Sequence, residues 1–163
     1  MSLLAEQVGR ALKARGMMLA TAESCTGGGV AQAVTEISGS SAWFERGFVT
    51  YSNQAKVEML GVRPATLQAR GAVSEAAVRE MAVGALSLSH AQLALAVSGI
   101  AGPTGGTPEK PVGTVWFAWA MRDGEVHVCR HLLSGDRAAV RERSVQIALQ
   151  GVLDLLDRHT KTA

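Results

Sequence analysis

The segment AESCTGGG, residues 22–29, combines three side chains that could do chemistry with three glycines: Ser24, Cys25 and Thr26 stand directly before them. An apolar run precedes the segment and helical spacing follows it, which indicates a turn from a strand into a helix. Backbone N–H groups in such a turn can stabilise an anion, and a serine hydroxyl there could act as a nucleophile. The residue types leave a second interpretation open, in which Ser24 or Thr26 only caps the helix.

A nucleophilic serine needs a base, and Lys56 is the candidate that the sequence offers. Burial in a pocket disfavours an ammonium ion, so a buried lysine amine can accept the serine proton. Tyr51 could relay a proton or orient the lysine. Both residues also have ordinary interpretations, as a solvated helix lysine and a packing aromatic. The histidines lie outside the candidate loops: His90, His127, His131 and His159.

Two further groups could contact a ligand. The glycine- and proline-rich stretch from Ser98 to Gly113 predicts a long functional loop, in which Gly102 and Thr104 are candidate contacts. It lacks the Gly-Lys-Ser/Thr ending of a P-loop, which argues against nucleoside triphosphate hydrolysis. Arg137 and Arg141 are four residues apart on one helix face and could clamp a phosphate or carboxylate. Local turn chemistry for Thr104 and a solvated face for the arginines remain alternatives.

Spacing and turn residues predict the elements that position these groups. Helices are expected over residues 2–15, 31–37, 53–60, 74–86 and 136–157, with Asn53 capping the third. Strands are expected over residues 17–22, 47–51, 93–97, 114–121 and 125–133. Alternation of strand and helix, followed by an Asp-Gly hairpin, predicts a three-layer α/β/α fold whose mixed, mostly parallel sheet ends in a late antiparallel hairpin. The three candidate loops then follow the carboxyl ends of strands, so we expect them to form one pocket.

Composition narrows the class of protein. The chain has 163 residues, 47% of them hydrophobic and 18% charged, with a net charge of +2, which predicts one globular domain over residues 1–163. No basic run is present, so a nucleic-acid partner is not expected. No leader or long apolar stretch is visible, which favours a cytoplasmic protein without a membrane partner. His127 and His131 lack a Cys, Asp or Glu at ligand spacing, so no metal site is expected.

Motifs in this order resemble those of the CinA C-terminal domain family, whose stand-alone members are nicotinamide-nucleotide amidases. The resemblance covers almost the whole chain and rests on TAESCTGG, GFVTYSNQAK, GAVSE, SGIAGPTGG, KPVGTV and GDR, which begin at Thr21, Gly47, Gly71, Ser98, Lys110 and Gly135. It implies an enzyme that deamidates nicotinamide mononucleotide to nicotinate mononucleotide without a cofactor or metal. Many relatives carry this domain behind a molybdopterin-binding-like domain, whose activity is not transferred to this chain.

The resemblance also implies roles for particular residues. Ser24 would be the nucleophile, Lys56 the base and Tyr51 an assisting hydroxyl. Thr26, Gly27 and Gly28 would supply amides to the oxyanion or ligand. Gly102 and Thr104, together with Arg137 or Arg141, would contact the nucleotide. A non-catalytic nucleotide-binding or regulatory module of the same family is the alternative. Trp43-Phe44 and the run from Trp116 to Trp119 offer apolar surface for a homo-oligomer such as a dimer, or else pack in the core.

Overall fold

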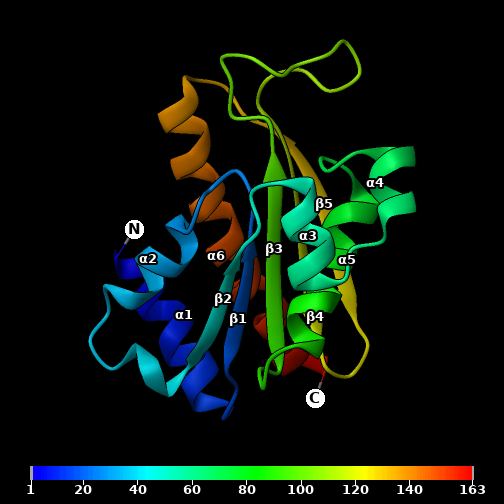
Figure 1. The fold of residues 1–163 in the computed structure, drawn as a ribbon. Helices are drawn as coiled ribbons and strands as arrows, with labels where there is room; N and C mark the ends of the chain where they lie inside the picture. The colour runs from blue at the N-terminus through cyan, green and yellow to red at the C-terminus, as the bar shows by residue number, and fades with distance from the viewer. Residues whose placement is uncertain (1, 163) are drawn as a thin grey trace.

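A five-stranded sheet forms the centre of the computed structural model, which describes the backbone of residues 2–162 and the side chains of residues 3–159 (Figure 1). The strands are β1 (Leu19–Glu23), β2 (Phe44–Val49), β3 (Leu93–Gly99), β4 (Thr114–Met121) and β5 (Val126–Leu132), in the spatial order β2-β1-β3-β4-β5. β1 pairs in parallel with β2 and β3, whereas the β3–β4 and β4–β5 pairs are antiparallel. β4 therefore runs against the other strands, and the predicted mixed sheet with a late hairpin is confirmed.

Helices cover both faces of the sheet. On one face lie α1 (Ser2–Ala14), α2 (Gly29–Thr35) and α6 (Arg137–Thr162), and on the other lie α3 (Asn53–Leu60), α4 (Pro64–Arg70) and α5 (Glu75–Ser87) (Figure 1). Each face has its own apolar cluster, because successive residues of a strand point to opposite faces: Leu19 packs with the α1 and α6 side chains, and Ala20 packs with those of α5. The three-layer architecture is confirmed.

The structure adds one helix that was not predicted, moves the start of β2 and changes the cap of α3. α4 is a short helix with Pro64 at its start, and its seven residues are too few to show a helical apolar pattern. β2 begins at Phe44, three residues before the predicted start, and ends at Val49. α3 is capped by Ser52, whose Oγ accepts a hydrogen bond from the Ala55 N–H at 3.0 Å, and not by Asn53.

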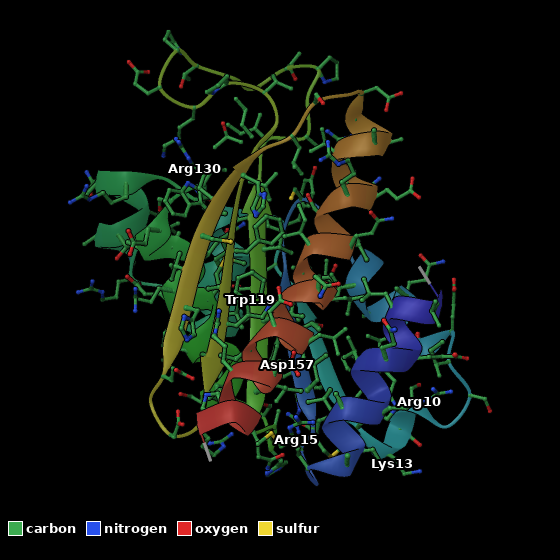
Figure 2. All side chains as sticks on the ribbon, turned by 180° about the vertical axis from the view of Figure 1, so that it is seen from behind. Arg10, Lys13, Arg15, Trp119, Arg130 and Asp157 are labelled. Atoms are coloured by element: carbon green, nitrogen blue, oxygen red, sulfur yellow. The ribbon has the colours of Figure 1, made fainter. Side chains whose placement is uncertain are left out.

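The large aromatic residues belong mostly to the interior. Trp43, Phe117 and Trp119 are buried in the cluster between the sheet and α1, α2 and α6. Figure 2 shows Trp119 between the strands and α6, where its indole N–H donates to the carbonyl of Ala148 at 2.9 Å. Core packing therefore accounts for these side chains, and a homo-oligomer stays a prediction. Within residues 2–162, none of the helices has both the length and the apolar character needed to cross a bilayer.

One edge of the sheet gathers the chemically interesting loops. The carboxyl ends of β1, β2 and β3 lie there, and residues 100–113 leave β3 and return into β4 at the same edge. Figure 1 shows this long loop at the top of the molecule, with the first turn of α6 beside it. Antiparallel pairing of β4 thus brings a late part of the chain back to the edge that the parallel strands define.

Candidate active site

Ser24 and Lys56 are in direct contact at the carboxyl edge of the sheet. The Lys56 Nζ donates to the Ser24 Oγ at 2.9 Å, across 32 positions of sequence. Ser24 directly follows β1, and Lys56 lies in the first turns of α3, after β2. Because β1 and β2 are parallel neighbours, their carboxyl ends carry the two side chains to the same place. Lys56 is 1% exposed and Ser24 is 8% exposed, so water is largely excluded from the pair.

The surroundings of the Lys56 amine suit a base. Its Nζ also donates to the carbonyl oxygens of Thr50 at 2.8 Å and Tyr51 at 3.1 Å. An ammonium group would use its three N–H bonds on these two carbonyls and Ser24, whereas a neutral amine would keep both carbonyls and turn its lone pair toward the Ser24 hydroxyl. No carboxylate of the described side chains forms an ion pair with it. Burial accordingly lowers the pKa of Lys56 to about 8.

Glu23, and neither hydroxyl, caps α2. Its carboxylate accepts the backbone N–H groups of Val30 at 2.8 Å and Ala31 at 3.0 Å, and the Thr26 hydroxyl at 2.5 Å. The sequence also allows Ser24 to cap this helix, but the Ser24 Oγ contacts Lys56, and the cap position itself is Gly28. Ser24 is therefore not a helix cap, because the N–H groups at the start of α2 donate to the Glu23 carboxylate instead.

Several residues that were predicted to contact the ligand do not line this pocket. Thr26, Gly27, Gly28 and Arg141 are absent from the pocket lining. The Arg141 guanidinium donates to the carbonyls of Cys25 at 3.0 Å and Thr26 at 3.3 Å, so it holds the turn from behind. Gly27 and Gly28 have φ of 58° and 98°, values that favour glycine and let the turn reverse tightly. The N–H groups of Cys25, Thr26 and Gly28 donate to no backbone carbonyl in the described part of the chain.

A pocket of about 290 Å³ opens over the Ser24–Lys56 pair. It brings together Tyr51, Gly102, Thr104 and Arg137 from three different segments. Arg137, the first residue of α6, donates to the carbonyl of Gly102 at 2.9 Å and to the Tyr51 hydroxyl at 3.0 Å. Tyr51 therefore meets Lys56 through its backbone carbonyl, and its hydroxyl meets Arg137 instead. Arg137 lines the pocket and Arg141 does not, so the two arginines contact different loops.

Cys25 lies beside the serine but is a poor nucleophile. It is 6% exposed, and burial raises the pKa of its thiol to about 11. None of the four histidines lines the pocket in the described part of the chain. The geometry therefore favours the hydroxyl of Ser24 over the neighbouring thiol.

Sequence reasoning missed some of the residues that shape the site. Glu23 had no assigned role, and Ser98, which is 1% exposed, and the Ala72-Val73 pair also line the pocket. The motif GAVSE contained Ala72 and Val73, and a glutamate before a glycine-rich turn is a signal for an N-terminal cap.

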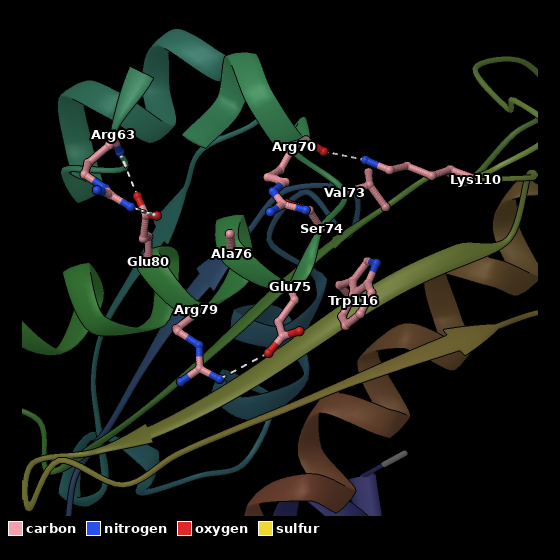
Figure 3. Close-up of a pocket in the computed structure, with 10 residues that line it drawn as sticks. All are labelled: Arg63, Arg70, Val73, Ser74, Glu75, Ala76, Arg79, Glu80, Lys110 and Trp116. Atoms are coloured by element: carbon pink, nitrogen blue, oxygen red, sulfur yellow. Dashed lines mark hydrogen bonds and ion pairs between the residues drawn. The ribbon is translucent and has the colours of Figure 1, made fainter. Parts of the chain in front are cut away.

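A larger hollow, of about 550 Å³, lies on the α4–α5 side and shares Val73 with the pocket (Figure 3). Its carboxylates are already paired: Glu80 with Arg63 at 3.3 Å and Glu75 with Arg79 at 3.3 Å. The Glu80 carboxylate also accepts the Thr66 hydroxyl at 2.6 Å, and the Lys110 amine donates to the carbonyl of Arg70 at 2.5 Å. These contacts hold α4 to α5 and to the long loop, so size alone does not make this hollow the reaction site.

Comparison with known proteins identifies the family of the chain. The family model described as the CinA C-terminal domain matches residues 1–156. The proteins named nicotinamide-nucleotide amidohydrolase PncC from Shigella flexneri and Escherichia coli (strain K12) are each 63% identical over 147 residues, which is 90% of this chain and 89% of theirs. The crystal structure of the competence/damage inducible protein CihA from Agrobacterium tumefaciens superposes with a TM-score of 0.92 at 47% identity, covering 96% of this chain and 94% of that one. The chain belongs to the CinA C-terminal domain family.

Proposed function

We propose that this protein hydrolyses the carboxamide of nicotinamide mononucleotide to nicotinate mononucleotide and ammonia, with Ser24 as nucleophile and Lys56 as base. The contact between the Lys56 Nζ and the Ser24 Oγ at the floor of a pocket carries this proposal. The names of the similar proteins support the choice of substrate, since they are called nicotinamide-nucleotide amidohydrolases.

The first half of the proposed reaction forms an ester. The neutral Lys56 amine takes the proton of the Ser24 hydroxyl as the oxygen attacks the carboxamide carbon. The carbonyl oxygen becomes an oxyanion. We assign its stabilisation to the backbone N–H group of Cys25, which follows Ser24, lines the pocket and donates to no backbone carbonyl in the described part of the chain. The Lys56 ammonium then gives its proton to the leaving nitrogen, which departs as ammonia and leaves an acyl group on Ser24.

The second half returns the enzyme to its starting state. A water molecule takes the place of the ammonia, Lys56 accepts one of its protons, and the hydroxide oxygen attacks the ester carbon. The C–O bond to Ser24 breaks, and Lys56 returns the proton to the serine oxygen. The steps consume one carboxamide and one water and release ammonia and a carboxylic acid. At neutral pH the acid loses its proton and the ammonia gains one, so the final products are carboxylate and ammonium.

The polar mouth of the pocket fits a nucleotide. We assign contact with the substrate phosphate to Arg137 and Thr104, which line the pocket. Arg137 uses one nitrogen on Gly102 and another on Tyr51, which fixes its planar guanidinium at the entrance. Arg141 receives a different role: it positions the Ser24 turn through the carbonyls of Cys25 and Thr26.

Ammonia release from nicotinamide mononucleotide tests the proposal directly. Wild-type protein should release ammonia and form nicotinate mononucleotide, whereas Ser24→Ala and Lys56→Ala should each lose about a thousandfold or more of kcat, because nucleophile and base act as a unit. Ser87→Ala and Lys13→Ala are matched controls on α5 and α1 that should keep wild-type rates.

The outcomes separate substrate from mechanism. If Ser24→Ala still hydrolyses nicotinamide mononucleotide, the Ser-Lys mechanism is contradicted, whereas the proposed substrate is supported. Folded wild-type protein that binds the nucleotide without releasing ammonia would identify a binding module. A panel of nicotinamide, its riboside, its mononucleotide and glutamine then tests the phosphate contact, since the mononucleotide should be preferred over the riboside.

A further inference from the structure

A cluster of metal-ligating side chains lies far from the pocket, at the opposite end of the sheet. Asp123 and Glu125 come from the turn between β4 and β5, and His159 comes from the last turns of α6. One potential ligand atom from each lies within 4.8 Å of those of the other two. Figure 2 shows the end of α6 beside this hairpin, at the lower end of the molecule in that view. Segments more than 30 residues apart thus deliver three donors to one point.

His127 lies beside this group of three and contacts one of its members, Glu125. It lies on β5, and its Nε2 is 3.1 Å from the Glu125 carboxylate. That nitrogen is sealed from solvent and has no hydrogen-bond partner in the described part of the chain, so its approach to Glu125 lacks hydrogen-bond geometry. The His159 Nε2 contacts the other oxygen of the same carboxylate. The Glu125 carboxylate therefore lies between two imidazole nitrogens.

We propose that His127, His159, Glu125 and Asp123 bind one Zn²⁺ ion, or a divalent transition metal of the same ligand preference. Imidazole nitrogens with carboxylate oxygens are ordinary zinc ligands, and four such donors complete a tetrahedron. Two neutral imidazoles and two carboxylates balance the charge of the dication. Hard cations such as Mg²⁺, which require octahedral oxygen coordination, fit this donor set poorly.

The distances place the cluster close to a binding geometry. Bonds of about 2.0–2.2 Å to a tetrahedral zinc separate neighbouring ligand atoms by about 3.4 Å. Ligand atoms of Asp123, Glu125 and His159 lie within 4.8 Å of one another, and the His127 Nε2 lies 3.1 Å from the Glu125 carboxylate. Side-chain rotations would bring these four donors around one ion. The side chains of His127, Glu125 and His159 are 39%, 37% and 32% exposed, which leaves the ion a path from solvent.

Binding at this cluster would tie the end of α6 to the β4–β5 hairpin. His159 is on α6, whereas the other three donors are on the hairpin, so the ion would close a link between segments that are distant in sequence. An ion that binds only the folded protein stabilises it, so zinc should raise the melting temperature. Above the dissociation constant, the added stability should grow with the logarithm of the free zinc concentration.

The test uses the full chain without a polyhistidine tag, because a tag would bind the same metals. After treatment with a chelator and its removal, the protein is titrated with ZnCl₂ in a calorimeter. We expect one Zn²⁺ per chain and a rise in melting temperature, and no heat with MgCl₂. His159→Gln and Glu125→Gln should each weaken zinc binding by at least about tenfold. Removing a residue that only supports a metal ligand already lowers metal affinity by about that factor, and these two residues are proposed as ligands themselves.

Matched controls separate this site from general histidine affinity. His131→Gln, on the same strand as His127, and His90→Gln, between α5 and β3, should bind zinc like the wild type. Circular dichroism checks that the His159 and Glu125 variants fold. Wild-type protein that takes up no zinc, or His159→Gln that binds it as tightly as the wild type, overturns the proposal; in that case the cluster is an ion-pair network that holds the helix end. Ser24→Ala should bind zinc normally, which keeps this result independent of the proposed amidase.

Discussion

Lys56 is the residue on which the proposed chemistry depends most. It is a fully enclosed lysine whose partners are two carbonyls and a hydroxyl, with no ion-pair carboxylate among the described side chains. A carboxylate partner would hold the charge on the amine, whereas burial without one lowers its pKa to about 8. The amine is thus close to the balance point between accepting and releasing a proton at physiological pH, as an acid-base catalyst requires.

This pKa predicts how activity changes with pH. Below about pH 8 Lys56 is an ammonium and cannot take the Ser24 proton, so kcat/KM should rise roughly tenfold per pH unit as the pH increases toward 8 and then level off. Ammonia release measured from pH 6 to 9.5 checks this. A profile that falls between pH 7 and 8, or is flat throughout, would contradict the role of Lys56 as base.

Cys25 gives a second prediction at this scale. At pH 8 a thiol with a pKa of about 11 is only about 0.1% thiolate, and it is 6% exposed. Cys25→Ala should therefore keep ammonia release within a few-fold of wild type, with the difference due to packing. Iodoacetamide at pH 8 should leave wild-type activity unchanged over the time in which it alkylates a small free thiol. Rapid inactivation would point to a thiol mechanism.

At the scale of elements, short helices and their caps set the geometry of the site. Lys56 sits in α3, a helix of eight residues whose first turn is fixed by the Ser52 hydroxyl. A helix this short has little stability of its own, so its cap and its packing decide where Lys56 lies. The same holds for the turn before α2, which depends on the Glu23 carboxylate and on Arg141.

A pair of cap variants separates stability from activity. Ser52→Ala and Ser74→Ala each remove a side chain that accepts the N–H of the third helical residue, in α3 and α5, and each should cost about 1 kcal/mol of unfolding free energy. Only Ser52→Ala should also lower kcat, because only α3 carries Lys56. Denaturant melts and ammonia release measure the two effects. Equal losses of kcat in both variants would show that α3 does not position the base.

Much of this arrangement was predictable from sequence. Ser24 and Lys56 follow adjacent parallel strands, and that topology brings loops together whatever their side chains are. Three features were not predictable. Lys56 is held by the backbone carbonyls of Thr50 and Tyr51, and every residue type has such a carbonyl, so the sequence carries no signal for these contacts. Helix α4 is too short to show a period. Arg137 and Arg141 lie on the same helix, so their spacing does not distinguish them. Their different roles follow from the loops that they contact, around Gly102 and around Cys25.

Over the whole molecule, the packing of α3, α4 and α5 against one another and against the sheet determines where Lys56 lies. Gly84 in α5 lies against the end of α3: a Cβ added there would be 1.9 Å from the carbonyl oxygen of Leu60. The two helices therefore approach as closely as backbone permits, and the position of α5 on the sheet fixes that of α3.

Gly84→Ala should consequently destabilise the protein, although alanine is the better helix former by about 1 kcal/mol. The clash with Leu60 should outweigh that gain and cost about 1–3 kcal/mol in total. It should also lower kcat by displacing α3 and Lys56. Val83→Ala, at the exposed neighbouring position, is the control and should melt close to wild type. A melting temperature that rises in Gly84→Ala would refute the close packing of α3 on α5.

The loop of residues 100–113 leaves β3 and re-enters the same sheet as β4, and the two strands pair along seven residues from Leu93–Met121 to Gly99–Val115. A protease that cuts at the exposed Glu109 would thus sever the chain without separating its halves. The fragments would stay joined through this ladder, and the wall of the pocket around Gly102 and Thr104 would lose its tether on one side. Nicked protein is therefore expected to keep its fold and its Ser24–Lys56 contact but to bind the proposed nucleotide substrate more weakly.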